Sequence, residues 1–521
     1  MTFPGILSIV IFLPAAAGVV LLGFPRRHRE AASWFSLGVS CAVLVLSIHL
    51  FTRFDSGRSG MQFVEFIPWV SSLELGYRVG VDGFSLLLVL LTALLTPIVL
   101  VSSWKSIAVR VPMWNFLILI METGMIGVFC ALDTFLFYVF WEVILIPMYF
   151  IIGVWGGEKR VYAALKFFIF TMAGSLLMLV AILWLGWYAS TLPGGRFTTD
   201  VTRLFEIART LPHGAAVWLF WGFAIAFLIK VPSFPLHTWL PDAHVEAPTG
   251  GSVILAGILL KMGTYGLVRY NLQMFPALAV EWAPFFAILG IVGIVYGALV
   301  AMVQTDAKKL VAYSSVSHMG FVLLGIAAMT TEALQGAILQ MVNHGLSTGA
   351  LFLLVGMMYD RRHTRMIEDF GGLARVMPVF ATVFLITALS SIGLPGLNGF
   401  VGEFLILLGS FRSPILGTPV YTAIAASGIV LSAVYMLWMY RRVFLGTVPS
   451  EAVGEMRDLD RRETGLLIPL VLLIVWIGIY PNTFLAKTSS FSRELTNTLI
   501  SVRDSSVLRP SGVDSTNTNN P

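Results

Sequence analysis

The sequence contains few charged residues: only 12% of its 521 residues are Asp, Glu, Lys or Arg, and 57% are hydrophobic. Soluble domains carry about 25% charged residues, so this balance excludes an ordinary soluble protein and is typical of a polytopic membrane protein. The formal net charge of +5 is small and is spread over many short loops. We therefore expect the chain to contact the lipid bilayer and not to bind nucleic acid.

Cysteine is equally scarce, with only Cys41 and Cys130 present, both in apolar segments. An iron–sulfur cluster needs about four cysteines, so neither a cluster nor a disulfide framework is expected. The sequence also contains no Walker loop, no GxGxxG after a strand and no hydrolytic constellation. We expect no cofactor in this chain, and its energy must come from an ion gradient or a partner protein.

Apolar runs of the roughly 20 residues needed to cross a bilayer recur along the chain. They predict an all-α polytopic protein with about fourteen transmembrane helices. The seventh is interrupted at Pro232 and Pro235, and the twelfth at 393–399, because proline and glycine break helices. The predicted spans are 5–23, 31–51, 83–104, 113–131, 134–153, 162–188, 215–240, 250–268, 284–303, 309–328, 333–359, 377–411, 419–440 and 464–480.

Lysine and arginine are concentrated in alternate loops, as expected of loops on the cytoplasmic side. The alternation fits fourteen spans with both termini outside the cytoplasm, and only Arg269 and Arg412 in the short outer loops. The polar tail 481–521 is expected to be mobile. The basic residues assigned to the cytoplasmic side are Arg26, Arg27, Arg29, Lys105, Arg110, Lys159, Arg160, Lys308, Lys309, Arg361, Arg362, Arg365, Arg375, Arg441, Arg442, Arg457, Arg461 and Arg462.

The two interrupted spans are five helices apart, and this odd offset predicts two five-helix units in opposite orientations. Paired interrupted helices point to an inverted-repeat transporter with its path at mid-membrane. The predicted organisation is 1–112 for helices 1–3, 113–268 for the first repeat, 284–440 for the second repeat, and 441–521 for a loop, helix 14 and the tail.

Four charged side chains at membrane depth are the first candidates for a proton path. A charge there costs roughly 2.5–3.5 kcal/mol on insertion scales, so it needs a partner or water. Lys230 precedes the first break, and Glu142, also mid-span, is its predicted partner. Lys261 lies one span beyond Lys230, and two lysines near each other would make at least one able to release a proton. Glu403 follows the second break.

Each of these residues has a structural alternative. Glu142 and Lys230 would then be a static ion pair that fixes helix packing. Lys261 would cap carbonyls of the broken helix, and Glu403 would accept the free backbone donors of its half-helix.

Histidines and further charges extend the set of candidates. His318 lies on a serine-rich helix face, and His344 lies in a similar environment. An unperturbed histidine pKa of about 6.5 suits a proton relay. Hydrogen-bonded core histidines, or bis-histidine haem ligation, are the alternatives. The secondary candidates are Glu122 as a second acidic partner, Lys166 near the inner edge, and His237, Asp242 and His244 in a polar loop without zinc-ligand spacing.

Four long runs resemble the antiporter-like membrane subunits of respiratory complex I. They are 132–149 around Glu142, 230–249 from Lys230 onward, 306–320 with its Ser-Ser-Val-Ser-His, and 393–403 with its Gly-Leu-Pro-Gly-Leu-Asn-Gly. Together with the hydrophobic profile, the resemblance covers nearly the whole chain. The length, without a long C-terminal lateral helix, and Glu403, where sister subunits often carry lysine, favour one branch of the family.

The resemblance implies a role for each candidate. Glu142 and Lys230 would be the coupled pair of a first half-channel, Lys261 the central connection, and Glu403 the terminal site. His318 and His344 would be further relay sites. Quinone reduction elsewhere in a bacterial inner-membrane complex would drive the transfer.

The expected partners are other complex I membrane subunits, including sister antiporter-like subunits, and indirectly a peripheral redox arm carrying FMN and iron–sulfur clusters. The alternatives are a subunit of a multisubunit Na⁺/H⁺ antiporter, a subunit of a membrane-bound hydrogenase, and a purely structural scaffold subunit.

Overall fold

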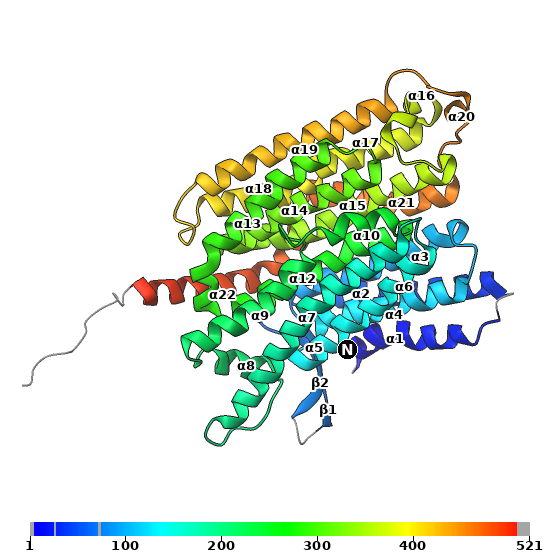
Figure 1. Ribbon diagram of the computed structural model, residues 1–521. Coiled ribbons are helices and arrows are strands. Elements are labelled where there is room, and N and C mark those ends of the chain that lie inside the picture. Colours follow the sequence, from blue (N-terminus) through cyan, green and yellow to red (C-terminus); the bar gives the residue numbers. More distant parts are fainter. Residues whose placement is uncertain (1–4, 26–27, 71–73, 508–521) are drawn as a thin grey trace, which may run out of the picture.

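The computed structural model describes residues 5–25, 28–70 and 74–507, so Arg26, Arg27 and the last fourteen residues of the tail lie outside it. Long helices run side by side through the molecule (Figure 1). The first half consists of α1 (Ile6–Leu22), α2 (Arg29–Arg53), α3 (Gly83–Ser106), α4 (Val111–Cys130), α5 (Thr134–Val143), α6 (Leu145–Trp155), α7 (Arg160–Thr191), α8 (Val201–Ala208), α9 (His213–Lys230), α10 (Trp239–Glu246), α11 (Thr249–Ile254), η3 (Leu255–Leu259), α12 (Leu260–Gly266) and η4 (Leu267–Leu272).

The second half follows without a break in the described chain. Its elements are α13 (Pro276–Met302), α14 (Ala307–Ala328), α15 (Thr331–Arg362), η5 (Ile367–Asp369), α16 (Leu373–Val376), α17 (Pro378–Ile392), α18 (Asn398–Phe411), α19 (Val420–Phe444), α20 (Glu451–Gly454), α21 (Arg461–Ile479) and α22 (Asn482–Val507). In Figure 1 early helices such as α1, α4 and α5 lie on one side of α12, α14 and α15, and α17–α19 lie on the other side.

Twelve helical stretches among the described residues are long and apolar enough to cross a membrane. Three shorter apolar helices, α1, α17 and α18, accompany them. The polytopic helical architecture is therefore confirmed, whereas the count of fourteen spans and the inverted repeats stay predictions. The most buried stretches are 249–272, α14 and α15, and the central charged side chain Lys261 on the first of them is enclosed by protein.

One small sheet departs from the all-helical prediction. In the loop 52–82, β1 (Gln62–Val70) pairs antiparallel with β2 (Leu75–Val81), with Phe66 opposite Arg78. The sequence pattern of a membrane protein is dominated by its apolar spans, and this hairpin lies between two of them.

The chain leaves its helical path directly after Lys230 and again a few residues before Glu403. After α9 ends at Lys230, the carbonyl of Ile229 accepts a hydrogen bond from Nε1 of Trp239 at 2.9 Å. A freed carbonyl at this depth needs such a partner. Between α17 and α18 the chain turns at Gly393, whose φ of +83° favours glycine.

Two further irregularities were not anticipated from the sequence. The fifth span is divided at Ile144 into α5 and α6, which leaves Glu142 at the end of α5. The eighth contains two π-helical segments, η3 and η4, on either side of α12, which carries Lys261. Such π segments occur frequently at functional sites.

The predicted mobility of the tail from residue 481 is wrong for residues 482–507, which form α22. Phe484, Phe491, Leu495 and Leu499 are buried and recur at helical spacing. Their common face packs against α3, α13 and α15. Polar composition concealed this apolar stripe, and α22 extends away from the helices at the left of Figure 1.

The contact of α22 with α3 gives a first prediction. A Cβ added at Gly83 would lie 1.7 Å from the carbonyl oxygen of Lys487, and backbone cannot move aside cheaply. We expect Gly83→Ala to destabilise the protein by about 1–3 kcal/mol, as overpacking usually does. Thermal unfolding would measure this, with Gly465→Ala as the control, because nothing lies within 4 Å of a Cβ there. Equal melting temperatures for both variants would contradict the prediction.

Candidate functional site

A buried row of ionisable side chains begins at Lys261 on α12. Its Nζ donates to Nδ1 of His344 on α15, at 2.6 Å, and also to the carbonyl oxygen of Ala256 in η3. Both side chains are buried. The second contact is carbonyl capping of the kind the structural alternative expected, so Lys261 combines that contact with a titratable partner.

The row continues through His318 on α14. Its ring centroid lies 5.8 Å from that of His344. Its Nδ1 lies 3.2 Å from Oε1 of Glu403, and its Nε2 lies 3.1 Å from Oγ of Ser391. The structure therefore brings Lys261, His344, His318 and Glu403 together from four separate helices.

Glu403, on α18, is buried and hydrogen bonded by side chains. Besides its contact with His318, its Oε1 accepts a hydrogen bond from Nε2 of Gln340 at 3.1 Å. Asn343 donates to Oε1 of Gln340 and to the carbonyl of Asn398, which begins α18. The hydrogen bonds to the carboxylate of Glu403 thus come from His318 and Gln340.

Sequence reasoning missed the polar residues around Glu403. Gln340, Asn343 and Ser347 share a face of α15 with His344, at spacings of three and four residues. That periodicity of polar side chains inside an apolar helix was the available signal.

Glu142 and Lys230 form a separate, looser pair. Nζ of Lys230 lies 5.4 Å from the ring centroids of both Trp141 and Phe167. Its charge interacts with that of Glu142, but among the described residues the two form no ion pair within 4.0 Å. Oε1 of the half-buried Glu142 has no hydrogen-bond partner in the described chain. The pair is open here and is not the tight ion pair of the structural alternative.

Lys261 and Lys230 contact side chains on different helices. Lys261 reaches α15, whereas Lys230 lies among aromatic rings of α5 and α7. Among the described residues the two lysines share no hydrogen-bond partner, and the mutual effect expected of neighbouring lysines stays a prediction.

The secondary candidates lie in four places. Lys166 and Asp242 form an ion pair at 2.7 Å that joins α7 to α10. His237 lies against the ring of Tyr296, with centroids 5.1 Å apart. His244 is fully buried and stacks on Phe352, and neither ring nitrogen has a partner among the described residues. Glu122 is fully buried on α4 beside Thr96, apart from these groups.

A buried ion pair escaped the sequence analysis. Arg269 lies inside η4, not in the short outer loop where we expected it, and its Nη2 is 2.6 Å from Oδ2 of Asp82. Both side chains are buried. Asp82 also caps α3 by accepting hydrogen bonds from the N–H groups of Phe84 and Ser85. The apolar run in the sequence ends just before Arg269, so its burial was not predicted. The π-helical turns extend the span past that point.

Lys308 is likewise buried, although its sequence suggested an exposed loop. Its Nζ donates to the carbonyl oxygen of Ala247 at the start of the stretch 249–272. Arg365 donates to the carbonyl of Val245 and pairs with Asp306 at 3.2 Å. Lys308 and Arg365, which the sequence assigned to cytoplasmic loops, therefore also hold neighbouring loops together.

At the surface, Asp460 caps α21 and pairs with Lys105 at 2.8 Å. The hydrogen bond from Lys105 lowers the pKa of Asp460 to about 2. A lowered folded-state pKa adds stability above the unfolded value, 3.8, and that stability is lost as the pH falls through about 2. The contribution is small, because both side chains are well exposed.

Within the described part of the chain, no three His, Cys, Asp or Glu side chains are arranged to hold a metal ion. Both ring nitrogens of His318 are engaged by protein groups, which does not favour the bis-histidine haem alternative in this arrangement.

Comparison with known proteins connects this geometry to a family. Residues 131–432 match the family described as NADH:quinone oxidoreductase/Mrp antiporter, TM. The chain is 46% identical over 492 residues to NADH-quinone oxidoreductase subunit M of Rhodobacter capsulatus, covering 92% of this chain and 93% of that one. The branch favoured by length and by Glu403 is thus subunit M.

Solved structures agree with the fold. A chain of respiratory complex I from Thermus thermophilus matches with a TM-score of 0.85 and 32% identity, covering 95% of this chain and 99% of that one. A chain of the Mrp complex from Dietzia sp. has a TM-score of 0.83 at 19% identity, covering 96% and 99%, which shows a shared fold alone. The chain belongs to the NADH:quinone oxidoreductase/Mrp antiporter family, as a membrane subunit of the subunit M type.

Proposed function

We propose that this chain carries protons across a bacterial cell membrane as a subunit of an NADH:quinone oxidoreductase. The observation that supports this most is the buried row Lys261, His344, His318 and Glu403. Buried ionisable groups in a membrane protein are costly, and they commonly mark proton relays.

Each member of the row has a neighbour to which a proton can move. Lys261 donates to Nδ1 of His344, whose Nε2 has no partner in the described chain and is free to exchange a proton. The ring centroids of His344 and His318 lie 5.8 Å apart, and a ring rotation or one bridging water would let a proton cross this gap. His318 then contacts the carboxylate of Glu403, the terminal site of the proposed path.

Glu142 and Lys230 form the driven end of the path in this proposal. When the carboxylate approaches Lys230, the ammonium gains a stabilising anion and holds its proton. When the carboxylate withdraws, the proton affinity of Lys230 falls and the proton moves toward Lys261. The unpartnered Oε1 of Glu142 and the division of its span at Ile144 suit a side chain that changes partner.

The secondary candidates extend the path toward one membrane face. Lys166, Asp242 and His237 would take up protons on the cytoplasmic side, and His244 would stand between that side and Lys261. Both termini would then face away from the cytoplasm. Two inverted half-channels, 113–268 and 284–440, would join at Lys261.

The partners in this proposal are the other membrane subunits of complex I. A peripheral arm with FMN and iron–sulfur clusters would supply electrons to quinone, and quinone reduction would drive the transfer from a distance. No redox step involves side chains of this chain.

Glu403→Gln tests the proposed terminal site. The amide keeps the size and hydrogen-bonding capacity of the side chain but cannot release a proton in the physiological range. We expect proton uptake by inverted vesicles, driven by NADH, to fall roughly a hundredfold, the lower range for loss of a positioned proton donor. Glu281→Gln on the exposed start of α13 is the control. Full pumping by assembled Glu403→Gln complex would support a scaffold role instead.

A further inference from the structure

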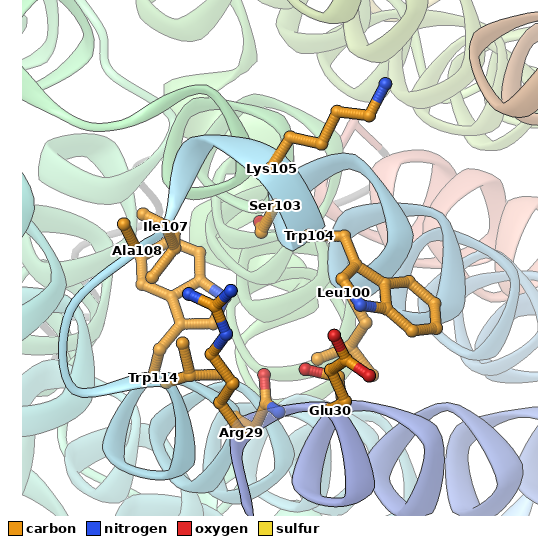
Figure 2. Close-up of a pocket in the computed structure, with 12 residues that line it drawn as sticks. Arg29, Glu30, Leu100, Ser103, Trp104, Lys105, Ile107, Ala108 and Trp114 are labelled. Carbon is orange, nitrogen blue, oxygen red and sulfur yellow. The ribbon is translucent and has the colours of Figure 1, made fainter. Parts of the chain in front are cut away.

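A polar cavity lies where the ends of three helices meet, far from the proton row in sequence. Its volume is about 260 Å³, and Arg29 and Glu30 of α2, Trp104 of α3, and Trp114 and Asn115 of α4 line it (Figure 2). Drug-sized ligands occupy roughly 300–1,000 Å³, so this cavity suits a smaller group.

Two buried donors on residues in the wall of the cavity have no partner among the described residues. Nε1 of Trp114 and Nδ2 of Asn115 form no hydrogen bond with any described residue, although the side chains are only 1% and 3% exposed. Buried N–H groups are nearly always paired, so donors of this kind indicate a missing acceptor.

The charges in the cavity have both signs. Figure 2 shows Arg29 and Glu30 rising from α2 into the cavity, whereas the ammonium of Lys105 points away from it. Lys105 is engaged with Asp460, at 2.8 Å. One guanidinium and one carboxylate therefore remain to bind a ligand, which favours a zwitterion over a simple anion.

The helix ends reinforce this pattern. The start of α4 has no side-chain cap, and helix N-termini attract phosphate. The end of α3 contributes negative potential, which attracts a cation. The ligand thus meets a phosphate-binding side and an ammonium-binding side within one cavity.

The position of the cavity favours the membrane surface as the source of a ligand. Trp34 is 64% exposed and packs edge-on against Trp104, with ring centroids 4.7 Å apart. Exposed tryptophan is enriched at the headgroup level of membranes. The starts of α2 and α4 and the end of α3 mark one boundary of the apolar region.

We propose that this cavity binds the headgroup of a phosphatidylethanolamine lipid. The phosphate accepts hydrogen bonds from Arg29, Trp114 and Asn115, and the ammonium faces Glu30 and the end of α3. The indole of Trp104 lies beside the ammonium side. Phosphatidylglycerol would leave Glu30 unpaired next to a second negative charge, and phosphatidylcholine has no N–H to donate to it.

Photolabelling of the intact complex tests this site. Phosphatidylethanolamine with a photoreactive group at the top of one acyl chain is added in nanodiscs, and labelled peptides are located. We expect labelling at the start of α2, the end of α3 and the start of α4, and we expect unlabelled phosphatidylethanolamine to suppress it. Equal suppression by phosphatidylglycerol would overturn the choice of headgroup. Equal suppression by inorganic phosphate would overturn the lipid as the source of the ligand. Uniform labelling along the chain would contradict the site itself.

Variants separate binding from packing. Asn115→Leu or Trp114→Phe removes one donor and should weaken labelling roughly tenfold. Trp218→Phe is the matched control, because Trp218 on α9 is 82% exposed and does not line the cavity. An equal loss in the control would overturn the proposal. Glu30→Gln provides an independent readout, since it should make phosphatidylglycerol compete as well as phosphatidylethanolamine, and an unchanged preference contradicts the assignment.

Discussion

Lys230→Met is expected to reduce NADH-driven proton uptake by roughly a hundredfold or more, while leaving the complex assembled. Methionine fits the apolar space between Trp141 and Phe167, so folding is preserved. It has no proton to release when Glu142 moves, and a positioned proton donor contributes about 10²–10⁴-fold to the rate of the step it serves. Proton uptake per electron pair in inverted membrane vesicles measures this effect.

Lys159→Ala provides the comparison, because that lysine is exposed and outside the proposed path. Assembly is checked by the yield of intact complex, and electron transfer is followed by quinone reduction with an artificial acceptor as reference. If Lys230→Met pumps as well as the parent complex, the proposed role of the Glu142–Lys230 pair is wrong.

Arg269→Leu is expected to destabilise the protein by about 3–5 kcal/mol, the usual cost of removing one partner of a buried ion pair. The reason is that Asp82 would remain buried without its counter-charge. Thermal unfolding of the purified complex measures the loss. The aromatic rings of Phe84, Tyr265 and Phe491 around the guanidinium would also lose their cation.

Adding Asp82→Asn to Arg269→Leu should restore most of the stability, because asparagine still caps α3 and carries no charge. Proton uptake per electron pair should stay normal in whatever complex assembles. A loss of pumping without a loss of stability would instead assign Arg269 and Asp82 to the proton path.

These two predictions contrast two buried charges whose partners the sequence does not reveal. Lys230 and Arg269 both lie at apolar depth in adjacent spans. Only the structure shows that Arg269 is locked by Asp82 while Lys230 has no direct ion pair among the described residues. A locked pair stabilises packing, whereas a loosely held charge can respond to a moving partner.

Part of the candidate site was readable from the sequence because it depends on composition. A charge in a run of apolar residues is conspicuous, so Lys230, Lys261, Glu142 and Glu403 could be selected one by one. Partners could not, since helices distant in sequence meet only after packing. His344 contacts Lys261 across 83 residues, and His318 contacts Glu403 across 85.

The sequence by itself determined that this is a polytopic helical membrane protein with interrupted helices, because hydrophobic length and proline or glycine breaks are local properties. Tertiary structure alone decided which charges meet, that α22 is a packed helix, and that Arg269 is buried. Those outcomes depend on the face each helix turns to its neighbours. That face shifts with every π-helical turn, such as η3 and η4 on either side of Lys261, and is not encoded by hydrophobicity alone.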